Sequence, residues 1–178
     1  MTLTIIVLVV LAVVLWIFYV SWRASRLDRL HNRAEAARTA LDLALVRRAS
    51  AAQELASSGL LDPAASLLLG DAVRRVRQVG LAERDLAESD LTRLLRATLG
   101  DPDFRKEFAG EDGAAELVAE VEAAAQQVFI ARKFYNDLAG RTVYARRRPL
   151  ARVLRLAGSA PLPGFFDMDD AMAGESIE

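Results

Sequence analysis

Few side chains in this chain could carry catalysis. It has 178 residues, no cysteine and a single histidine, His31. Without cysteine there is neither a thiol nucleophile nor a thiolate ligand for a metal. A Ser-His-Asp triad would have to use His31, and no G-x-S-x-G motif accompanies it. We therefore expect His31 to be an ordinary residue on the surface of a helix.

Paired carboxylates are the second chemical signal. Glu116 and Glu120 are one helical turn apart, and Glu83 and Asp90 are on different turns. A di-iron bundle needs two Glu-x-x-His pairs, which one histidine cannot supply. No glycine-rich phosphate loop, G-x-G-x-x-G or G-x-x-x-x-G-K, is present. The sequence predicts no enzymatic activity, no cofactor, no metal site and no small-molecule substrate.

Charge is segregated near the C-terminus. Residues 141–155 contain six arginines and no acidic residue, and residues 159–178 contain five acidic residues and no basic one. Apolar residues recur between the arginines at helical spacing, which is typical of a basic amphipathic stretch on an anionic membrane. The arginines that would contact lipid are Arg146, Arg147, Arg148, Arg152 and Arg155. The alternative is a solvated helix end that pairs with acidic residues elsewhere.

An uncharged segment near the N-terminus is the element that would position the rest of the chain. It runs from Leu3 to Val20 without a charge. At about 1.5 Å per residue it covers roughly 27 Å, close to the hydrocarbon thickness of a bilayer. Trp16 and Trp22 lie near its far end, as at a membrane interface. A cleaved signal peptide is the alternative, but it would need a basic residue before the apolar run. We predict that residues 1–22 form a retained transmembrane anchor.

The basic residues beyond the anchor predict its orientation. Four arginines lie from Arg23 to Arg33, opposed only by Asp28, whereas only Met1 and Thr2 precede the segment. The positive-inside rule places the C-terminal domain in the cytoplasm and the N-terminus outside. The chain has 23 basic and 24 acidic residues in all, so its near-neutral charge gives no signal for nucleic acid.

The rest of the sequence is rich in strong helix formers and lacks the alternating apolar and polar residues typical of strands. Helices are expected over about residues 22–57, 63–79, 82–99 and 113–148, and the short connections imply antiparallel neighbours. We predict an all-α fold, an N-terminal transmembrane helix followed by an antiparallel four-helix bundle with long first and last helices. The expected parts are the anchor (1–22), the cytoplasmic helical bundle (23–150), and a short basic amphipathic stretch with a flexible acidic tail (151–178).

Apolar residues at three-four spacing predict the buried faces of these helices. The last helix has the most regular stripe, typical of a coiled-coil seam: Leu117, Val121, Ala124, Val128, Ala131, Tyr135 and Leu138. The stripe of the first helix is Leu27, Leu30, Ala34, Ala37, Leu41, Ala44 or Leu45, Ala52 and Leu55. In the two shorter helices the predicted buried sides include Leu68, Ala72, Val76 and Val79, and Leu86, Leu91, Leu94 and Leu95.

Short motifs on the first and last helices resemble those of a known family. The first helix contains N-R-A-E-A-A from residue 32 and L-D-L-A-L-V-R-R from residue 41, and the last contains A-R-K-F-Y-N-D from residue 131. In their order and spacing these are similar to the patterns N-R-V-E-N-A, I-D-x-x-L-x-R-R and A-R-x-x-Y-N-D of the LemA family of bacterial membrane proteins. The residues that carry the resemblance are Asn32, Arg33, Glu35, Asp42, Arg47, Arg48, Arg132, Tyr135, Asn136 and Asp137.

The resemblance implies a membrane-anchored antiparallel helical bundle in a bacterial inner membrane, without an established enzymatic activity. The chain departs from the family at Arg38, where a tryptophan is common, and at Thr142-Val143, which replace a second Tyr-Asn pair. The residues themselves favour a structural role for Tyr135 and Asn136. The tyrosine ring falls in the seam, and the amide could bond to Arg33 or Glu35 and fix the helical register.

Two functions remain open. The first is a protein-interaction or scaffolding module that binds other membrane-associated proteins or itself. The second is a regulator that senses the membrane surface through the arginine-rich stretch. Phe165 and Phe166 follow two prolines and are flanked by acidic residues. We expect them to dock into a partner or into the bundle itself, the alternative being a frayed chain end without a role.

Overall fold

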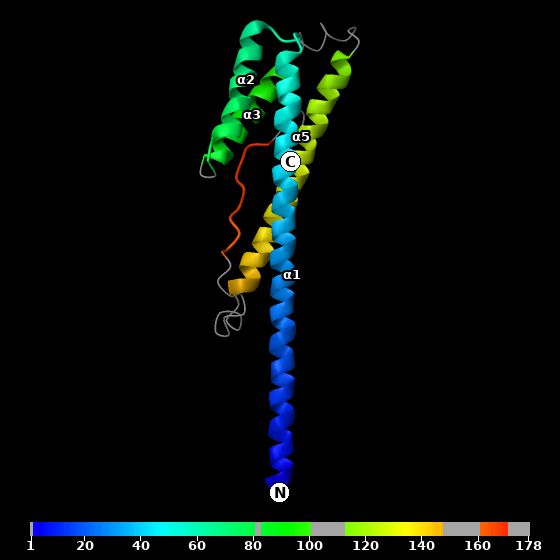
Figure 1. Cartoon of the computed structure of the whole chain (residues 1–178), viewed down its shortest axis with the longest axis vertical. Coiled ribbons are helices and arrows are strands. Elements are labelled where there is room, and N and C mark those ends of the chain that lie inside the picture. The colour runs from blue at the N-terminus through cyan, green and yellow to red at the C-terminus, as the bar shows by residue number, and fades with distance from the viewer. Residues whose placement is uncertain (1, 81–82, 101–112, 148–160, 171–178) are drawn as a thin grey trace. The chain divides into compact units, whose positions relative to one another are not determined.

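The computed structural model describes residues 2–80, 83–100, 113–147 and 161–170 (Figure 1). These ranges contain four helices and no strand: α1 (Thr2–Ser57), α2 (Pro63–Gln78), α3 (Arg84–Leu99) and α5 (Ala114–Arg147). Residues 161–170 form a segment without helical or strand structure. The predicted all-α class, with long first and last helices, is confirmed.

The helix boundaries follow from the local sequence. At the end of α1 the Ser58 hydroxyl donates to the Leu55 carbonyl at 2.8 Å, and Gly59 turns the chain with a φ of +81°. Glycine adopts such a left-handed conformation without the steric cost that other residues meet. Asp62 then caps α2, because its Oδ1 accepts the backbone N–H groups of Ala64 and Ala65 at 2.9 and 3.1 Å. The predicted break at residues 58–62 is therefore a stop signal followed by an N-cap.

Helix α1 is continuous over 56 residues and contains the uncharged segment. The large apolar side chains from Leu3 to Phe18 are each at least 50% exposed. A soluble amphipathic helix would bury one stripe of such side chains against a core. By length and composition, this helix can cross a membrane.

The chain divides into two compact units. The anchor unit consists of Met1–Ala37 and Asn136–Phe165, and the bundle unit consists of Arg38–Tyr135 and Phe166–Glu178. In the anchor unit, small or short side chains of α1 and α5 are buried: Ala34, Ala37, Ala139 and Thr142.

Contacts inside the bundle unit give the directions of its helices. Arg38 meets Tyr135, and Arg47 meets Gln127, so residue numbers rise along α1 as they fall along α5. Helices α1 and α5 are therefore antiparallel. Asp42 pairs with Arg84 and Arg48 with Glu88, so α1 and α3 run in the same direction. The order is that of an antiparallel bundle in which alternate helices are parallel.

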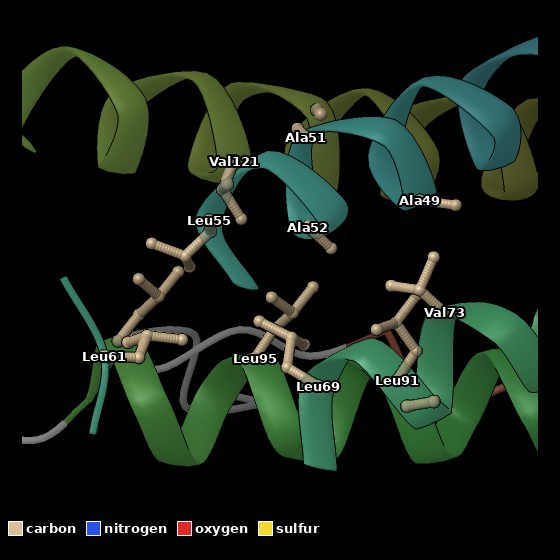
Figure 2. Packing of buried hydrophobic residues seen from close by; sticks show 13 residues of the cluster. Ala49, Ala51, Ala52, Leu55, Leu61, Leu69, Val73, Leu91, Leu95 and Val121 are labelled. Atoms are coloured by element: carbon tan, nitrogen blue, oxygen red, sulfur yellow. The ribbon is translucent and has the colours of Figure 1, made fainter. Parts of the chain in front are cut away.

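The bundle unit buries a hydrophobic core contributed by all four helices (Figure 2). Its buried members are Ala49, Ala51, Ala52, Leu55, Leu61, Leu69, Ala72, Val73, Leu91, Leu95, Leu99, Val121 and Ala124. Small alanines on α1 face larger leucines and valines on α2 and α3, a combination that allows close packing. The predicted seam of α5 is confirmed at Val121, Ala124, Val128 and Tyr135, which are all buried.

The predicted faces of the two short helices need correction. Leu68 is 58% exposed, and the buried residues of α2 are Leu69, Ala72 and Val73. Three leucines stand in a row at residues 67–69, so spacing alone could not select the inward one. On α3 Leu86 is 69% exposed and the adjacent Ala87 is buried, whereas Leu91 and Leu95 are buried as predicted.

Candidate functional site

A buried ion pair joins α1 to α3 inside the bundle unit. Arg48 and Glu88 are 1% and 0% exposed, and Arg48 Nη2 lies 2.7 Å from Glu88 Oε2. Arg48 Nη1 donates to the Thr92 hydroxyl at 2.7 Å, and that hydroxyl donates to the Glu88 carbonyl at 3.0 Å. Three polar side chains on otherwise apolar helix faces thereby satisfy much of one another's hydrogen-bonding capacity.

Burial dominates the electrostatics of this pair. It raises the pKa of Glu88 above its ordinary value of 4.5, and the charge of Arg48 offsets only part of that effect. Burial likewise lowers the pKa of Arg48, against the opposing attraction of Glu88. Removing two ions from water is costly, and this cost offsets much of their attraction. The pair is suited to fixing the register of α1 against α3.

A row of alternating charges extends from the buried pair toward the surface. Arg84 Nε lies 3.9 Å from Glu88 Oε1, and Arg84 Nη1 lies 2.9 Å from Asp42 Oδ1. Asp42 Oδ2 in turn lies 3.8 Å from Arg38 Nε. Each acidic group therefore stands between two guanidinium groups, so the row links α1 and α3 at successive turns.

Arg38 also contacts two aromatic rings. Its Nη1 donates to the Tyr135 hydroxyl at 3.4 Å, and its guanidinium carbon lies 5.5 Å from the centre of the Tyr135 ring. The same carbon lies 5.9 Å from the centre of the Phe166 ring, within the range of cation–π attraction. Burial alone would lower the pKa of Arg38, but Tyr135 and nearby carboxylates raise it overall. Arg38 thus joins α1, α5 and the C-terminal segment.

Residues Phe166–Asp170, here called the strap, belong to the bundle unit and pack against its helices with every second residue buried. Phe166, Met168 and Asp170 are buried, at 2%, 5% and 8% exposure, whereas Asp167 and Asp169 are exposed. Side chains of an extended chain point alternately to opposite sides, so every second residue can face the protein. Burying the phenylalanine and the methionine contributes about 1.5–3 kcal/mol each.

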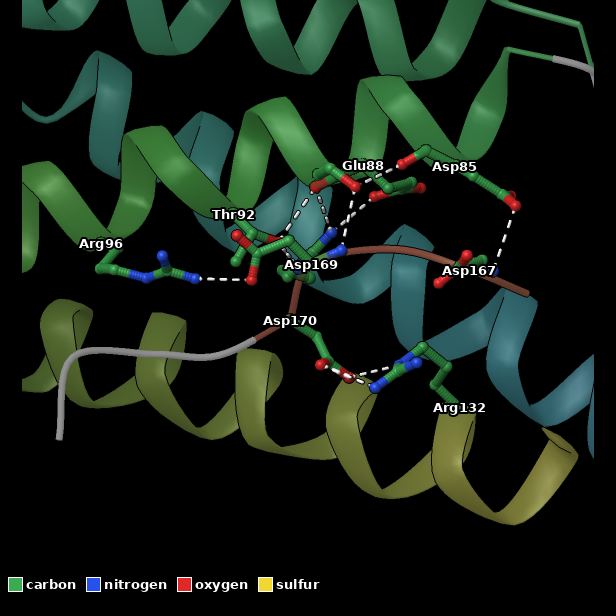
Figure 3. Close-up of polar contacts among 10 residues, drawn as sticks. Asp85, Glu88, Thr92, Arg96, Arg132, Asp167, Asp169 and Asp170 are labelled. Atoms are coloured by element: carbon green, nitrogen blue, oxygen red, sulfur yellow. Dashed lines mark hydrogen bonds and ion pairs between the residues drawn. The ribbon is translucent and has the colours of Figure 1, made fainter. Parts of the chain in front are cut away.

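Polar contacts attach the strap to α3 and α5 (Figure 3). The Asp170 carboxylate pairs with Arg132 through both Nε and Nη2, the latter at 2.8 Å, and Asp169 Oδ1 lies 2.8 Å from Arg96 Nη2. The backbone N–H groups of Asp167 and Asp169 donate to Asp85 and Ser89 at 3.1 and 3.0 Å. We call the surface that receives these contacts the strap site. It consists of Arg38, Asp85, Ser89, Arg96 and Arg132 with the apolar surface around them.

The structure distributes the motif residues over several environments. Asp42 and Arg48 belong to the charge row, and Arg132 and Tyr135 lie at the strap site. Arg47 is a surface residue whose Nη1 donates to Gln127 Oε1 at 3.4 Å and whose Nη2 lies 3.9 Å from Glu120 Oε1. The remaining motif residues are in the anchor unit: Asn32, Arg33 and Glu35 are exposed, Asn136 is half-buried, and Asp137 pairs with Arg141.

The residues expected to meet a membrane or a partner lie mostly at the surface. Leu3, Trp16 and Trp22 are exposed and Val20 is half-buried. Arg146 donates to the Pro161 carbonyl at 3.0 Å, and Arg147 is exposed; Arg148, Arg152 and Arg155 fall outside the described residues. The two phenylalanines differ, because Phe165 is 59% exposed whereas Phe166 is buried.

Sequence reasoning missed several residues of the site, namely Arg84, Asp85, Glu88, Ser89, Thr92, Arg96, Asp169 and Asp170. A signal for the buried pair did exist. Arg48 stands one turn from Ala44 and from Ala52 on the apolar stripe of α1, and Glu88 stands one turn before Thr92 on α3. A charged residue on an apolar stripe calls for an opposite charge on the facing helix.

A hollow of 420 Å³ opens beside Glu88 in the bundle unit. Its lining is mostly aliphatic, with Leu45, Val46, Val76 and Val79, and Arg77 and Arg84 supply charge. Among the residues that the structure describes, no group of three histidine, cysteine or acidic side chains is placed to hold a metal ion. The hollow thus offers an apolar wall and guanidinium groups but no cluster of metal ligands.

Fold and site together define an all-helical protein in which a helix able to cross a membrane continues into an ion-paired bundle. No protein-family model matches the sequence. No curated protein and no solved structure matches it either.

Proposed function

We propose that this chain is a single-pass membrane protein whose helical bundle is a protein-interaction or scaffolding module on the cytoplasmic side. Its partners would be other membrane-associated proteins or further copies of itself. The resemblance to the LemA family supports a bacterial inner-membrane location. The proposal involves no catalytic step, cofactor or nucleic acid.

One observation carries this proposal. Helix α1 exposes an uncharged apolar segment, Leu3 to Val20, and continues unbroken into the bundle. Such an apolar surface is stable in a bilayer but not in water. A continuous helix transmits the position of the anchor directly to the bundle, which suits a module held at the membrane surface.

Exposed apolar side chains on the bundle unit indicate where a partner would bind. Leu43 on α1, and Ile130 and Phe134 on α5, are each 58–66% exposed. Leu43 precedes Arg47 by one turn, and Ile130 follows Gln127 by about one turn. Because Arg47 contacts Gln127 across the antiparallel pair, these apolar residues fall on the same outer side of α1 and α5. We call this group the outer patch; exposed apolar groups of this kind mark interaction sites.

Site-specific photo-cross-linking of the full chain in native membranes tests the proposal. A photoreactive residue in place of Phe134 should form a defined adduct, and Leu43→Ser should diminish that adduct because it removes apolar contact area. The matched control carries the photoreactive residue at Arg93, which is exposed on α3. An adduct of twice the chain mass would identify self-association. Absence of any adduct specific to position 134, with the chain present in membranes, would contradict the proposal.

A membrane-surface sensor is the second candidate, favoured by the composition of the anchor unit. This unit contains both the apolar segment of α1 and the C-terminal end of α5, with Arg146 and Arg147. Arginines near an anionic leaflet contribute about 1 kcal/mol each, an attraction that salt weakens. Flotation with anionic vesicles, using a chain without residues 1–22, separates the candidates. Retention that is lost on raising salt favours the sensor.

A further inference from the structure

The strap is held in the manner of a bound peptide. Its residues have neither helical nor strand structure, and two of its backbone N–H groups donate to side chains of α3, Asp85 and Ser89. The Ser89 hydroxyl donates its own hydrogen to the Asp85 carbonyl, which leaves its oxygen free to accept. These backbone contacts depend on an extended chain and not on the side chains that it carries. The strap site would therefore offer them to any extended segment.

Other contacts select for particular side chains. Phe166 and Met168 are buried at alternate positions, and Arg38 lies near the ring of Phe166. The positions that follow Met168 favour carboxylates, since Asp169 and Asp170 pair with Arg96 and Arg132. The strap site thus distinguishes large apolar groups two residues apart, followed by carboxylates. Such alternation is how proteins recognise extended peptides.

The charges of the strap site favour an acidic occupant. Arg132 is 21% exposed and faces the Asp170 carboxylate. The negative charge of Asp170 also acts to raise the pKa of the buried Arg48. Arg48 is already paired with Glu88. The carboxylate of Asp170 is therefore the counter-charge of Arg132. With the strap removed, a partly buried guanidinium would lose that counter-charge, which is unfavourable. Another acidic segment would restore the balance.

We propose that the strap site is a peptide-recognition site for a partner protein, which supplies an extended acidic segment with large apolar side chains at alternate positions. The chain's own strap occupies the site until the partner displaces it. This inference rests on the proposed interaction function and names the chemistry of one partner. Because the strap is tethered to its site, its effective concentration is high, and binding of a separate chain is weak until the strap is released.

The ion pair at the surface offers a way for displacement to begin. Arg96 and Asp169 are 34% and 41% exposed, so water and salt screen their attraction. Asp170 and Phe166 are held more deeply. A competing segment can therefore first replace Asp169 on Arg96 and then displace the buried residues.

A binding experiment on the full chain in detergent tests the proposal. The probe is a fluorescent peptide with the sequence of residues 161–170, PLPGFFDMDD. The release variant, Phe166→Ala with Asp170→Asn, should bind this peptide at least about tenfold more tightly than wild type, because its own strap competes less. A peptide carrying asparagine in place of both Asp169 and Asp170 should bind at least about tenfold more weakly, having lost two charge-assisted contacts.

Matched substitutions in the release variant locate the peptide. Arg132→Gln should weaken its binding at least about tenfold through loss of a bidentate ion pair. Arg93→Gln should leave the affinity unchanged, because Arg93 is exposed and pairs with Asp90 instead. Equal affinity in these two variants would place the peptide elsewhere and overturn the proposal.

A chain that ends at Phe165 keeps the test decisive. If this chain unfolds cooperatively on heating but does not bind the peptide, the strap site accepts no separate segment and the proposal is wrong. If it loses cooperative unfolding, the strap is a permanent part of the fold, and the proposal is again wrong. Cross-linking from the outer patch uses a chain with an intact strap. Failure of the peptide experiment can therefore be told from failure of the proposed function.

Discussion

Arg48 shows how one buried cation constrains this protein. Its side chain is 1% exposed, and its guanidinium reaches Glu88 and Thr92 on α3. Because both ions lost their hydration on folding, the pair adds little net stability, yet breaking it leaves an uncompensated charge. By the same reasoning, we expect that apolar residues of similar volume can replace both partners together but not one alone.

Replacing Arg48 alone should be strongly destabilising. We expect Arg48→Met to lower the free energy of unfolding by about 3–5 kcal/mol at neutral pH, since the buried Glu88 then keeps only the more distant Arg84 as a cation. The double variant Arg48→Met with Glu88→Leu should recover most of that loss. Denaturant unfolding of the full chain in detergent, analysed as a double-mutant cycle, measures both. Equal losses in the single and double variants would contradict the account.

The loss in Arg48→Met should also depend on pH. Burial already raises the pKa of Glu88 above 4.5, and removing Arg48 takes away the attraction that holds it down. A carboxyl with a raised folded-state pKa contributes stability below its unfolded pKa, and that stability is lost as pH rises through the folded value. The free energy of unfolding of the single variant should therefore fall more than that of wild type as pH rises from 4.5 to neutrality. A difference in unfolding free energy that stays constant over this range would exclude Glu88 as the cause.

The helices show what a sequence pattern can and cannot predict. The stops at Ser58-Gly59 and the cap at Asp62 are local signals, and the structure follows them. Spacing also predicted the seam of α5, because its apolar residues recur without ambiguity. It failed at Leu68, where neighbouring leucines fit equally well.

The strap could be predicted only in part. Phe166 was expected to dock, but its surroundings depend on Arg38, which is distant in sequence. Likewise Asp169 and Asp170 pair with residues 73 and 38 positions away. An extended segment has no helical periodicity from which its buried side could be predicted. Contacts between residues so far apart in the chain also produce no local pattern in a single sequence.

The seam of α5 gives a matched pair of substitutions. Tyr135 is 2% exposed and accepts a hydrogen bond from Arg38, whereas Lys133 is exposed. Tyr135→Ala should lower the free energy of unfolding by about 3 kcal/mol or more, as truncation of a buried aromatic residue does. Lys133→Ala should change it by less than about 0.5 kcal/mol. Denaturant unfolding of both variants compares them; equal and small effects would mean that the seam lies on another face.

Helix α1 joins the two functions that the proposal assigns to the chain, anchoring and binding. Its first part exposes apolar side chains, and its later part carries Leu41, Leu45 and Arg48 into the bundle unit. No glycine or proline interrupts it. If residues 1–22 cross the membrane, the helix leads directly from lipid to the core without a flexible linker.

Reporter fusions after Glu178 test this central claim most directly. The four arginines that follow Tyr19 predict a cytoplasmic C-terminus. A fused fluorescent protein that matures only in the cytoplasm should be bright, and a fused phosphatase that needs the periplasm should be inactive, with both fusions in the membrane fraction. Recovery of the fusions in the soluble fraction, or an active phosphatase, would contradict a cytoplasmic interaction module held by a membrane anchor.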